Sequence, residues 1–122
     1  MVIKGEVIRG LSLGRKLGFP TANIALGDQF DIENGVYLSS VVLDGKKYNA
    51  ISNIGVKPTI GEVVARGLEC HIIDFAGDLY GESIEVELLE KMRDEMRFES
   101  VEALKRQVEL DIEHVKKLKI NI

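Results

Sequence analysis

The sequence predicts a small antiparallel β-barrel with one C-terminal helix packed on its outside. Three observations lead to this fold class: a length of 122 residues, a series of β-branched segments over the first two thirds of the chain, and a change to helical periodicity near Ser100. With 45% hydrophobic residues, a chain of this length can bury the core of one domain. We expect one domain over residues 1–122, with the barrel at about 1–92 and the helix at about 100–119.

The strands are predicted first from residues 2–9 and 36–43, which are rich in β-branched residues. The pattern resumes at residues 46–51, and further strands are expected at 64–75 and 82–90. Asp44 and Gly45 separate the second run from the third, and Asp-Gly in this position is a strong signal for a tight hairpin. Closing about five or six antiparallel strands into a barrel would remove the exposed sheet edges.

The C-terminal helix is predicted from apolar residues that recur at steps of three and four. They form one stripe made of Val101, Leu104, Val108, Ile112, Val115 and Leu118. Ser100 is suited to cap the helix, because a serine hydroxyl can accept a hydrogen bond from a backbone N–H of the first turn. The stripe is the face that we expect to pack on the barrel.

Charge and composition argue against several classes of function. The 16 basic and 20 acidic residues give a formal net charge of -4 and are scattered, so we expect no nucleic-acid partner. No apolar run approaches the roughly 18 to 20 residues that span a bilayer, and no signal-peptide pattern follows Met1. We therefore expect no membrane partner and a cytoplasmic location. Cys70, the single cysteine, is interpreted as a reduced core residue.

The stretch LGRKLGFPTANIAL at residues 13–26 is too rich in glycine for a helix and too polar for an ordinary core strand. Gly10, Gly14 and Gly18 recur at steps of four and leave the backbone free to approach a ligand, so that N–H groups can face a phosphate. The stretch matches neither the Walker A pattern nor GxGxxG. An ordinary loop is the alternative interpretation of these glycines.

Thr21 and Asn23 supply a hydroxyl and an amide oxygen two residues apart. In an extended segment both side chains lie on one face. Mg²⁺ accepts such oxygen ligands and takes its others from waters and substrate phosphates. The two residues are therefore candidate metal ligands, and the alternative is that they satisfy backbone groups at the start of a strand.

Glu69 is a candidate site residue because of its neighbours in a predicted strand. Strand alternation puts Leu68 and Cys70 on one face, and Glu69 and His71 on the other. A carboxylate and an imidazole on one face of a strand form a candidate site. The alternative is a half-exposed strand with solvated polar residues. His114 lies among charges in the terminal helix and is interpreted as a surface residue.

Six motifs, taken in their order and spacing, carry a resemblance to a known family. They are GRKLGFPTANI at 14–24, NGVY at 34–37, NIGVKPT at 53–59, LECHIIDF at 68–75, DLYG at 78–81 and RDEMRF at 93–98. Together they closely resemble riboflavin kinase, a domain that also forms the C-terminal half of bifunctional bacterial FAD synthetases. The resemblance covers essentially the whole chain. It implies a six-stranded antiparallel Greek-key barrel and transfer of the γ-phosphoryl of ATP to the ribityl 5'-hydroxyl of riboflavin, giving FMN and ADP.

The resemblance also implies a role for each candidate residue. The loop that covers the phosphates is matched by Gly10, Gly14, Arg15 and Gly18. Thr21 and Asn23 match the ligands of Mg²⁺, and Glu69 matches the catalytic base. Tyr80 lies where the family holds the adenine, and Arg93 lies near the flavin.

The expected partners are riboflavin and ATP, and we expect a monomer. The nucleotidyltransferase half of the bifunctional enzymes has no counterpart in these 122 residues, so we do not expect this chain to make FAD. Two alternatives are a flavin-binding module without catalysis and a purely structural barrel. The metal pair and the base argue against the first alternative, and the glycine-rich stretch argues against the second.

Overall fold

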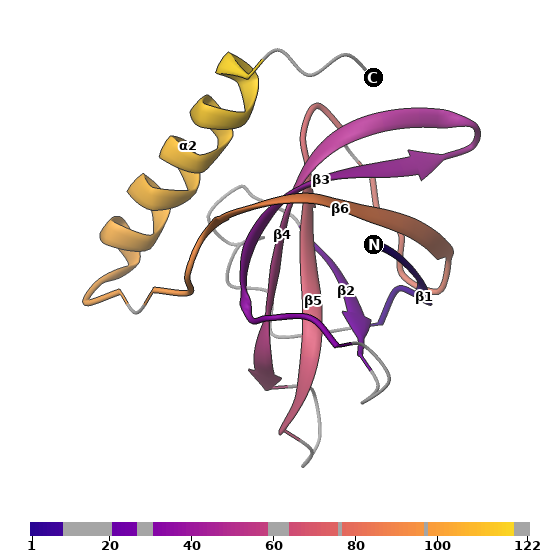
Figure 1. Cartoon of the computed structure of the whole chain (residues 1–122), viewed down its shortest axis with the longest axis horizontal. Helices are drawn as coiled ribbons and strands as arrows, with labels where there is room; N and C mark the ends of the chain where they lie inside the picture. The colour runs from indigo at the N-terminus through magenta and orange to yellow at the C-terminus, as the bar shows by residue number, and fades with distance from the viewer. Residues whose placement is uncertain (9–20, 27–30, 59–63, 76, 97, 119–122) are drawn as a thin grey trace.

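The structure is a computed structural model, and it describes residues 1–8, 21–26, 31–58, 64–75, 77–96 and 98–118. These residues form six strands and one helix (Figure 1). The elements are β1 (Val2–Glu6), β2 (Ala22–Ala25), β3 (Gly35–Leu43), β4 (Lys46–Pro58), β5 (Val64–Ile72), β6 (Ser83–Arg93) and α2 (Val101–Lys117).

All strand pairs are antiparallel, in the order β1-β6-β3-β4-β5-β2. Strands β3, β4 and β5 follow one another along the chain, and β6 returns to lie beside β3, which is the Greek-key arrangement. Strands β1 and β2, at the two ends of this order, approach each other through a bridge between Ile8 and Asn23 and nearly close the barrel. The expected six-stranded Greek-key barrel with a C-terminal helix is confirmed.

The hairpin between β3 and β4 forms at the predicted Asp-Gly pair. Asp44 and Gly45 both have positive φ, 50° and 78°, as the favoured two-residue hairpin turn requires. The strand predicted at residues 46–51 is too short, because β4 continues to Pro58. The strand continues because alternation persists through polar residues: Ser52 is fully buried, and its hydroxyl is 2.7 Å from the hydroxyl of Ser39.

The barrel interior is filled by alternate residues of the strands. Its members are Ile3, Val7, Ala22, Ile24, Leu26, Tyr37, Val41, Ala50, Ile54, Leu68, Cys70, Ile72, Ile84, Val86 and Leu88. Cys70 is free and fully buried, as predicted, and burial raises the pKa of its thiol to about 12. The thiol is therefore kept neutral, and it serves as a small apolar core group.

Gly5 allows β1 to approach β2 where the barrel closes. The Ile8 N–H donates to the Asn23 carbonyl at 2.7 Å, and a Cβ on Gly5 would lie 2.5 Å from Cγ2 of Ile24. Ile24 belongs to the packed interior and is 3% exposed. A side chain at position 5 would therefore push the two end strands apart.

Gly5→Ala is expected to lower the free energy of unfolding by about 1 to 3 kcal/mol, the usual cost of overpacking a core. Denaturant unfolding measures the change. In the double variant Gly5→Ala/Ile24→Ala, the added methyl group meets free space. The double variant should therefore lose less free energy of unfolding than the sum of the losses in the two single variants. Strictly additive losses would show that the Gly5–Ile24 contact does not limit barrel closure.

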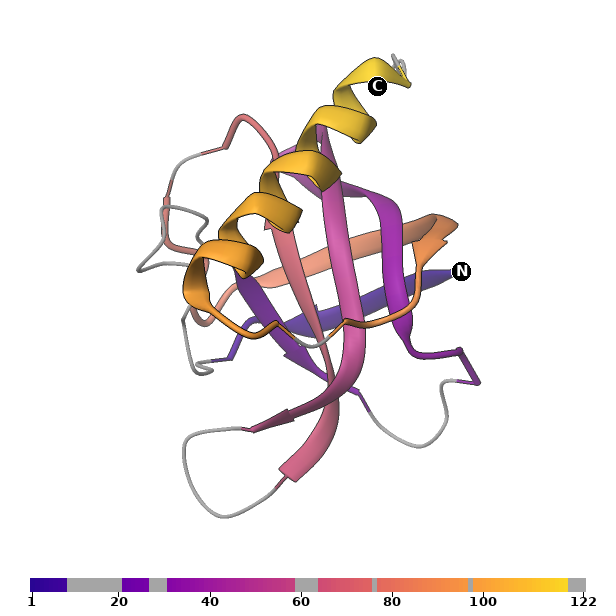
Figure 2. The same cartoon turned by 90° about the vertical axis from the view of Figure 1, so that its left-hand side faces the viewer.

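Helix α2 lies against the outside of the barrel wall (Figure 2). A second apolar cluster joins Val115 of the helix to Val36, Leu38, Ile51 and Ile73 of the wall. The predicted cap is confirmed, since the Ala103 N–H donates to the Ser100 hydroxyl at 3.1 Å. No helix in the described part of the chain has the length and apolar character needed to cross a membrane.

The two ends of the predicted apolar stripe do not pack on the barrel. Val101 is 51% exposed and Leu118 is 43% exposed, whereas Val115 is fully buried. Asp111, a charged residue, is only 6% exposed and takes a central place on the packed face. The helix is therefore attached by a short apolar contact and by a polar contact that the stripe does not show.

Candidate functional site

The strand register brings the predicted base beside one of the predicted metal ligands. Glu69 of β5 lies directly opposite Asn23 of β2 on one side and Asn53 of β4 on the other. Side chains directly opposite each other in a sheet lie on the same face. All three residues are partly exposed, whereas their neighbours Ala22, Leu68 and Ile54 are buried in the barrel interior. We call Asn23, Glu69 and Asn53 the site row, and it lies on the outer face of the barrel.

The predicted face of Glu69 is confirmed by this arrangement. Leu68 and Cys70 point into the barrel and are at most 1% exposed, while Glu69 and His71 are half-buried on the outside. Glu69 and His71 both have interaction partners in the structure. The role of Glu69 as a catalytic base stays a prediction.

Thr21 immediately precedes β2 and is partly exposed. Because Ala22 points inward, alternation puts Thr21 and Asn23 on the same outer side. Among the described residues no group of three or more His, Cys, Asp or Glu side chains could hold a metal ion. A hydroxyl and an amide oxygen suit Mg²⁺ that takes its remaining ligands from phosphates and waters, so the donor chemistry here fits that ion.

Tyr80 lies in the connection between β5 and β6, close to the chain that leads into the glycine-rich stretch. Its backbone N–H donates to the Asp78 carboxylate at 2.9 Å, and its side chain is 52% exposed. The adjacent Gly81 N–H donates to the Val7 carbonyl, and the Val7 N–H donates to the backbone carbonyl of Glu82, both at 2.9 Å. This connection is thereby fixed next to the end of β1.

The predicted phosphate-loop residues follow Ile8, the last described residue after β1, in the chain. Gly10, Gly14, Arg15 and Gly18 lie outside the described residues. Ile8 is paired with Asn23, and Val7 with the segment after Tyr80. The structure therefore brings the chain that enters the loop, the Tyr80 connection and Asn23 to one part of the barrel.

Arg93, the predicted flavin-side residue, ends β6 and contacts helix α2. Its Nε and one terminal nitrogen donate to the two carboxylate oxygens of Asp111 at 3.2 and 2.8 Å. The other terminal nitrogen donates to the Asp94 carbonyl at 3.0 Å. Gln107 donates to the same Asp111 carboxylate at 3.0 Å. Arg93 thus joins the barrel to the helix, and a contact between Arg93 and the flavin stays a prediction.

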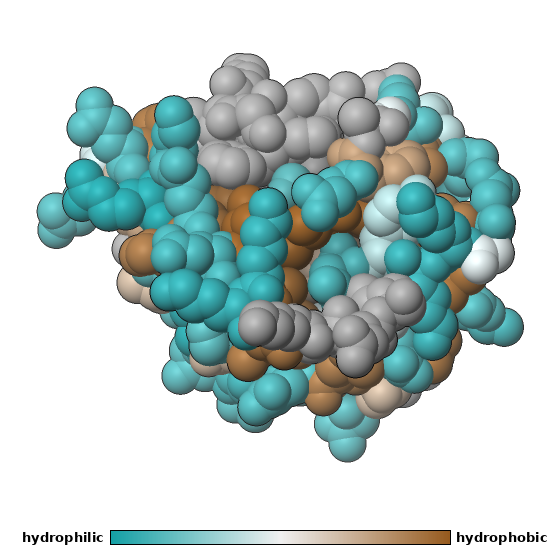
Figure 3. All heavy atoms as spheres, turned by 90° about the horizontal axis from the view of Figure 1, so that it is seen from above, coloured by the Kyte–Doolittle hydropathy of each residue, from teal (hydrophilic) through white to brown (hydrophobic). Residues whose placement is uncertain are grey.

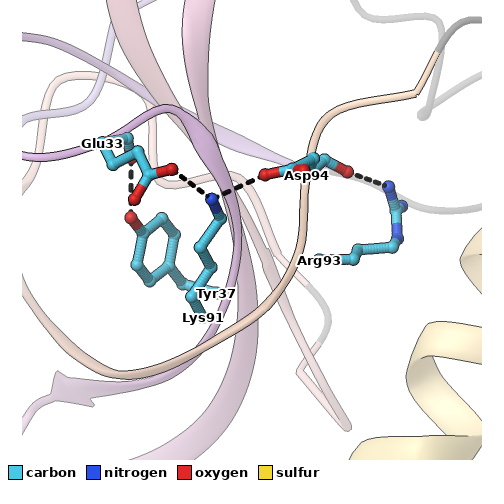
Figure 4. Close-up of polar contacts among 5 residues, drawn as sticks. All are labelled: Glu33, Tyr37, Lys91, Arg93 and Asp94. Carbon is cyan, nitrogen blue, oxygen red and sulfur yellow. Dashed lines mark hydrogen bonds and ion pairs between the residues drawn. The ribbon is translucent and has the colours of Figure 1, made fainter.

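Lys91 forms a second polar contact at this end of β6 (Figure 4). Its amine lies 2.7 Å from Glu33 and 2.6 Å from Asp94. Hydrogen bonds to these two carboxylates raise the pKa of Lys91, and the same contact lowers the pKa of Asp94. The Tyr37 hydroxyl donates to the Glu33 carbonyl at 2.6 Å. The segment before β3 and the segment after β6 are therefore joined through one lysine.

Two residues near the site row were not assigned a role from the sequence. Asn53 lies opposite Glu69, and its only sequence signal is its place at the start of the NIGVKPT motif. Glu95 lies over Gly55, where a Cβ would come within 2.5 Å of the Glu95 Cδ. Glu95 belongs to the RDEMRF motif, but no local pattern indicates that it reaches β4.

An open groove beside the C-terminal half of α2 is separate from these residues. Its described lining consists of Glu109, Ile112, Glu113, Lys116 and Lys117. Seen from above, the molecule shows hydrophobic atoms exposed among hydrophilic side chains (Figure 3). None of the predicted site residues that the structure describes is part of that lining.

Comparison with known proteins gives a consistent result. A family model described as riboflavin kinase matches residues 1–119. The RNA-binding riboflavin kinase RibR of Bacillus subtilis is 44% identical over 116 residues, which is 95% of this chain and 50% of that protein. The bifunctional riboflavin kinase/FMN adenylyltransferase of Pseudomonas fluorescens is 44% identical over 110 residues, 90% of this chain and 35% of that enzyme.

Solved structures agree with the fold. A protein of Streptococcus pneumoniae, described as a macrolide-efflux protein, has a TM-score of 0.81 and 36% identity, covering 94% of this chain and 38% of that one. Riboflavin kinase of Trypanosoma brucei has a TM-score of 0.64 over 96% of this chain and 78% of its own. At 22% identity, the second comparison supports the fold alone.

The family model and the two curated relatives define the class of protein, a kinase family whose members transfer a phosphoryl group from ATP. The chain belongs to the riboflavin kinase family, and it matches the kinase part of the bifunctional enzymes. It spans half or less of the length of the curated relatives described above.

Proposed function

We propose that this chain phosphorylates riboflavin at the ribityl 5'-hydroxyl with ATP, giving FMN and ADP. The observation that carries the proposal is the site row, because the register sets Glu69 directly opposite Asn23 on the same outer face. Phosphoryl transfer needs charge neutralisation at the phosphates and a group that accepts the proton of the attacking hydroxyl. Neighbouring oxygen ligands and a carboxylate meet both needs.

The nucleotide is proposed to bind where the Tyr80 connection, the end of β1 and the start of β2 meet. The exposed Tyr80 ring offers a face on which adenine can stack. Gly10, Gly14, Arg15 and Gly18 are proposed to cover the phosphates. The Thr21 hydroxyl and the Asn23 amide oxygen would hold Mg²⁺, which when bound neutralises charge on the phosphates.

Glu69 is proposed to orient the 5'-hydroxyl and to accept its proton as the oxygen attacks the γ-phosphorus. One P–O bond forms to the ribityl oxygen, and the bond between the γ-phosphorus and the bridging oxygen of ADP breaks. The proton moves to the Glu69 carboxylate and then to solvent. Cytoplasmic location and a monomeric state stay predictions.

The test is incubation of the purified chain with riboflavin, ATP and Mg²⁺, followed by chromatography of the flavins. FMN is expected to accumulate with stoichiometric ADP, and FAD is not. Omitting ATP or adding EDTA should abolish the FMN peak. Flavin binding without FMN formation would instead support the non-catalytic module, and FAD formation would contradict the expectation of a kinase alone.

A further inference from the structure

Helix α2 is attached to the end of β6 by a partly buried ion pair between Arg93 and Asp111. Asp111 is 6% exposed, and its carboxylate receives three hydrogen bonds, two from Arg93 and one from Gln107. Two parallel hydrogen bonds between guanidinium and carboxylate fix both distance and orientation. The pair therefore sets the position of the backbone at residue 93 relative to the helix.

The local irregularity of β6 makes this contact possible. Tyr37 pairs with Lys91 and Val36 pairs with Arg93, so Met92 is an extra residue in the ladder. Such a bulge turns the following side chain to a new direction. Met92 packs against the apolar cluster beneath α2, while Arg93 meets Asp111.

The segment that follows β6 is held a second time through Asp94. Its carboxylate pairs with Lys91, and its carbonyl accepts a hydrogen bond from Arg93 (Figure 4). Two basic residues on β6 thus hold one residue from two sides. The next residue, Glu95, is thereby delivered to a defined place over β4.

That place is beside the site row. Along β4 and β5, the outward-facing positions next to Asn53 and Glu69 are Gly55 and Gly67, which lie opposite each other and carry no side chain. The Glu95 carboxylate lies over Gly55. Two residues along a strand span about 6.5 Å, so Glu95 is roughly one such step from the site row.

We propose that Glu95 accepts hydrogen bonds from hydroxyl groups of the polyol chain of the acceptor substrate, and that Asp111 positions Glu95 through Arg93. This inference rests on the proposed function. A polyol whose terminal hydroxyl meets Glu69 can extend along the barrel face past Asn53 toward Glu95. Glu95 has partners within the protein. A carboxylate has about four acceptor sites, so it can hold a substrate hydroxyl in addition.

The binding contribution of Glu95 can be isolated by pairing a protein variant with a ligand variant. Lumiflavin carries the riboflavin ring with a methyl group in place of the polyol. Affinities of both flavins are measured by quenching of flavin fluorescence in the presence of Mg-ADP. Glu95→Ala is expected to weaken riboflavin binding roughly tenfold to a hundredfold, the range for hydrogen bonds to a charged group, and to leave lumiflavin binding unchanged.

Glu99→Ala is the matched control, because Glu99 is an exposed carboxylate four positions further along the chain. It is expected to leave both affinities at the parental values. Equal losses for riboflavin and lumiflavin in Glu95→Ala would overturn the assignment to the polyol, and so would parental affinity for both. A parent chain that binds neither flavin would overturn the proposed function together with this inference.

The positioning role of Asp111 is tested by the ratio of the two affinities. The paired replacement Arg93→Met/Asp111→Leu removes the ion pair without leaving a buried charge alone, so the fold should persist, as circular dichroism can verify. We expect this variant to lose most of the preference for riboflavin over lumiflavin. Adding Glu95→Ala to the paired replacement should then reduce this preference only slightly further. Two outcomes would contradict positioning through Arg93: an unchanged preference in the paired replacement, or effects of the paired replacement and of Glu95→Ala on the preference that are fully additive.

Discussion

Glu69→Gln is expected to lower kcat for FMN formation by roughly 10² to 10⁴, the range that general acid–base assistance supplies. The substitution keeps the shape of the side chain and one hydrogen-bonding oxygen, but an amide does not take up the proton of the attacking hydroxyl. Glu69 lies between Asn23 and Asn53 in the ladder, so the variant should fold without rearrangement. Initial rates of FMN formation at saturating substrates measure the effect.

Glu87→Gln is the matched control for this experiment. Glu87 is an exposed carboxylate on β6, separated from β5 by two strands in the sheet order. It should retain parental kcat, and both variants should retain the parental affinity for Mg-ATP. A folded Glu69→Gln enzyme that binds both substrates and has a kcat within about threefold of the parental value would rule out Glu69 as the general base.

Thr21→Ala and Asn23→Ala are each expected to lower kcat/KM for Mg-ATP by roughly 10² or more, because each would remove a proposed oxygen ligand of Mg²⁺, an ion that in such sites contributes several kcal/mol of charge stabilisation. Asn23 is bonded to Ile8 through its backbone, so truncation of its side chain leaves that bridge intact. Rates measured across a range of Mg²⁺ concentrations should show that more metal is needed for half-maximal activity.

Thr21→Ser serves as the control, since it keeps the hydroxyl and should keep most of the activity. Loss of the folded state in both alanine variants, measured by circular dichroism, would point to a structural role instead. Normal rates with an unchanged metal requirement would falsify the assignment of these two oxygens to Mg²⁺.

Local sequence patterns were sufficient for the elements whose cause is local. The hairpin at Asp44 and Gly45 depends on two adjacent backbone conformations, and the start of α2 depends on one hydroxyl near the first turn. The outer position of Glu69 follows from alternation within a single strand. Each of these features could be predicted because the residues that determine it are close together in the chain.

The composition of the site depends instead on pairing between distant segments. Asn23, Glu69 and Asn53 come from three strands. A shift of one residue in the β2–β5 ladder would separate Glu69 from Asn23, and a shift in the β4–β5 ladder would separate it from Asn53. No residue of the chain marks this register by itself. The neighbourhood of the predicted base therefore required the structure.

The polar contact that attaches α2 to the barrel could not be predicted from the sequence for a different reason. In an apolar periodicity, Asp111 counts as a gap, although it is more buried than either end of the stripe. Its partner Arg93 reaches it because of a bulge, which follows from the pairing of β6 with β3 and not from composition. A buried charge can be recognised only together with the opposite charge that compensates it.

The order of the strands also determines when the barrel can be completed during synthesis. β1 makes its ladder with β6, so that Val2 pairs with Glu87, and β2 makes its ladder with β5, so that Ala22 pairs with Cys70. During synthesis, β1 and β2 therefore cannot pair with their partners until most of the chain has left the ribosome, whereas β3 and β4 can form a hairpin early. Such non-local pairing places the barrel among the slower folders, in the range of milliseconds to seconds. The segment between β1 and β2, which holds the glycine-rich stretch, is flanked by the strands that find their partners last.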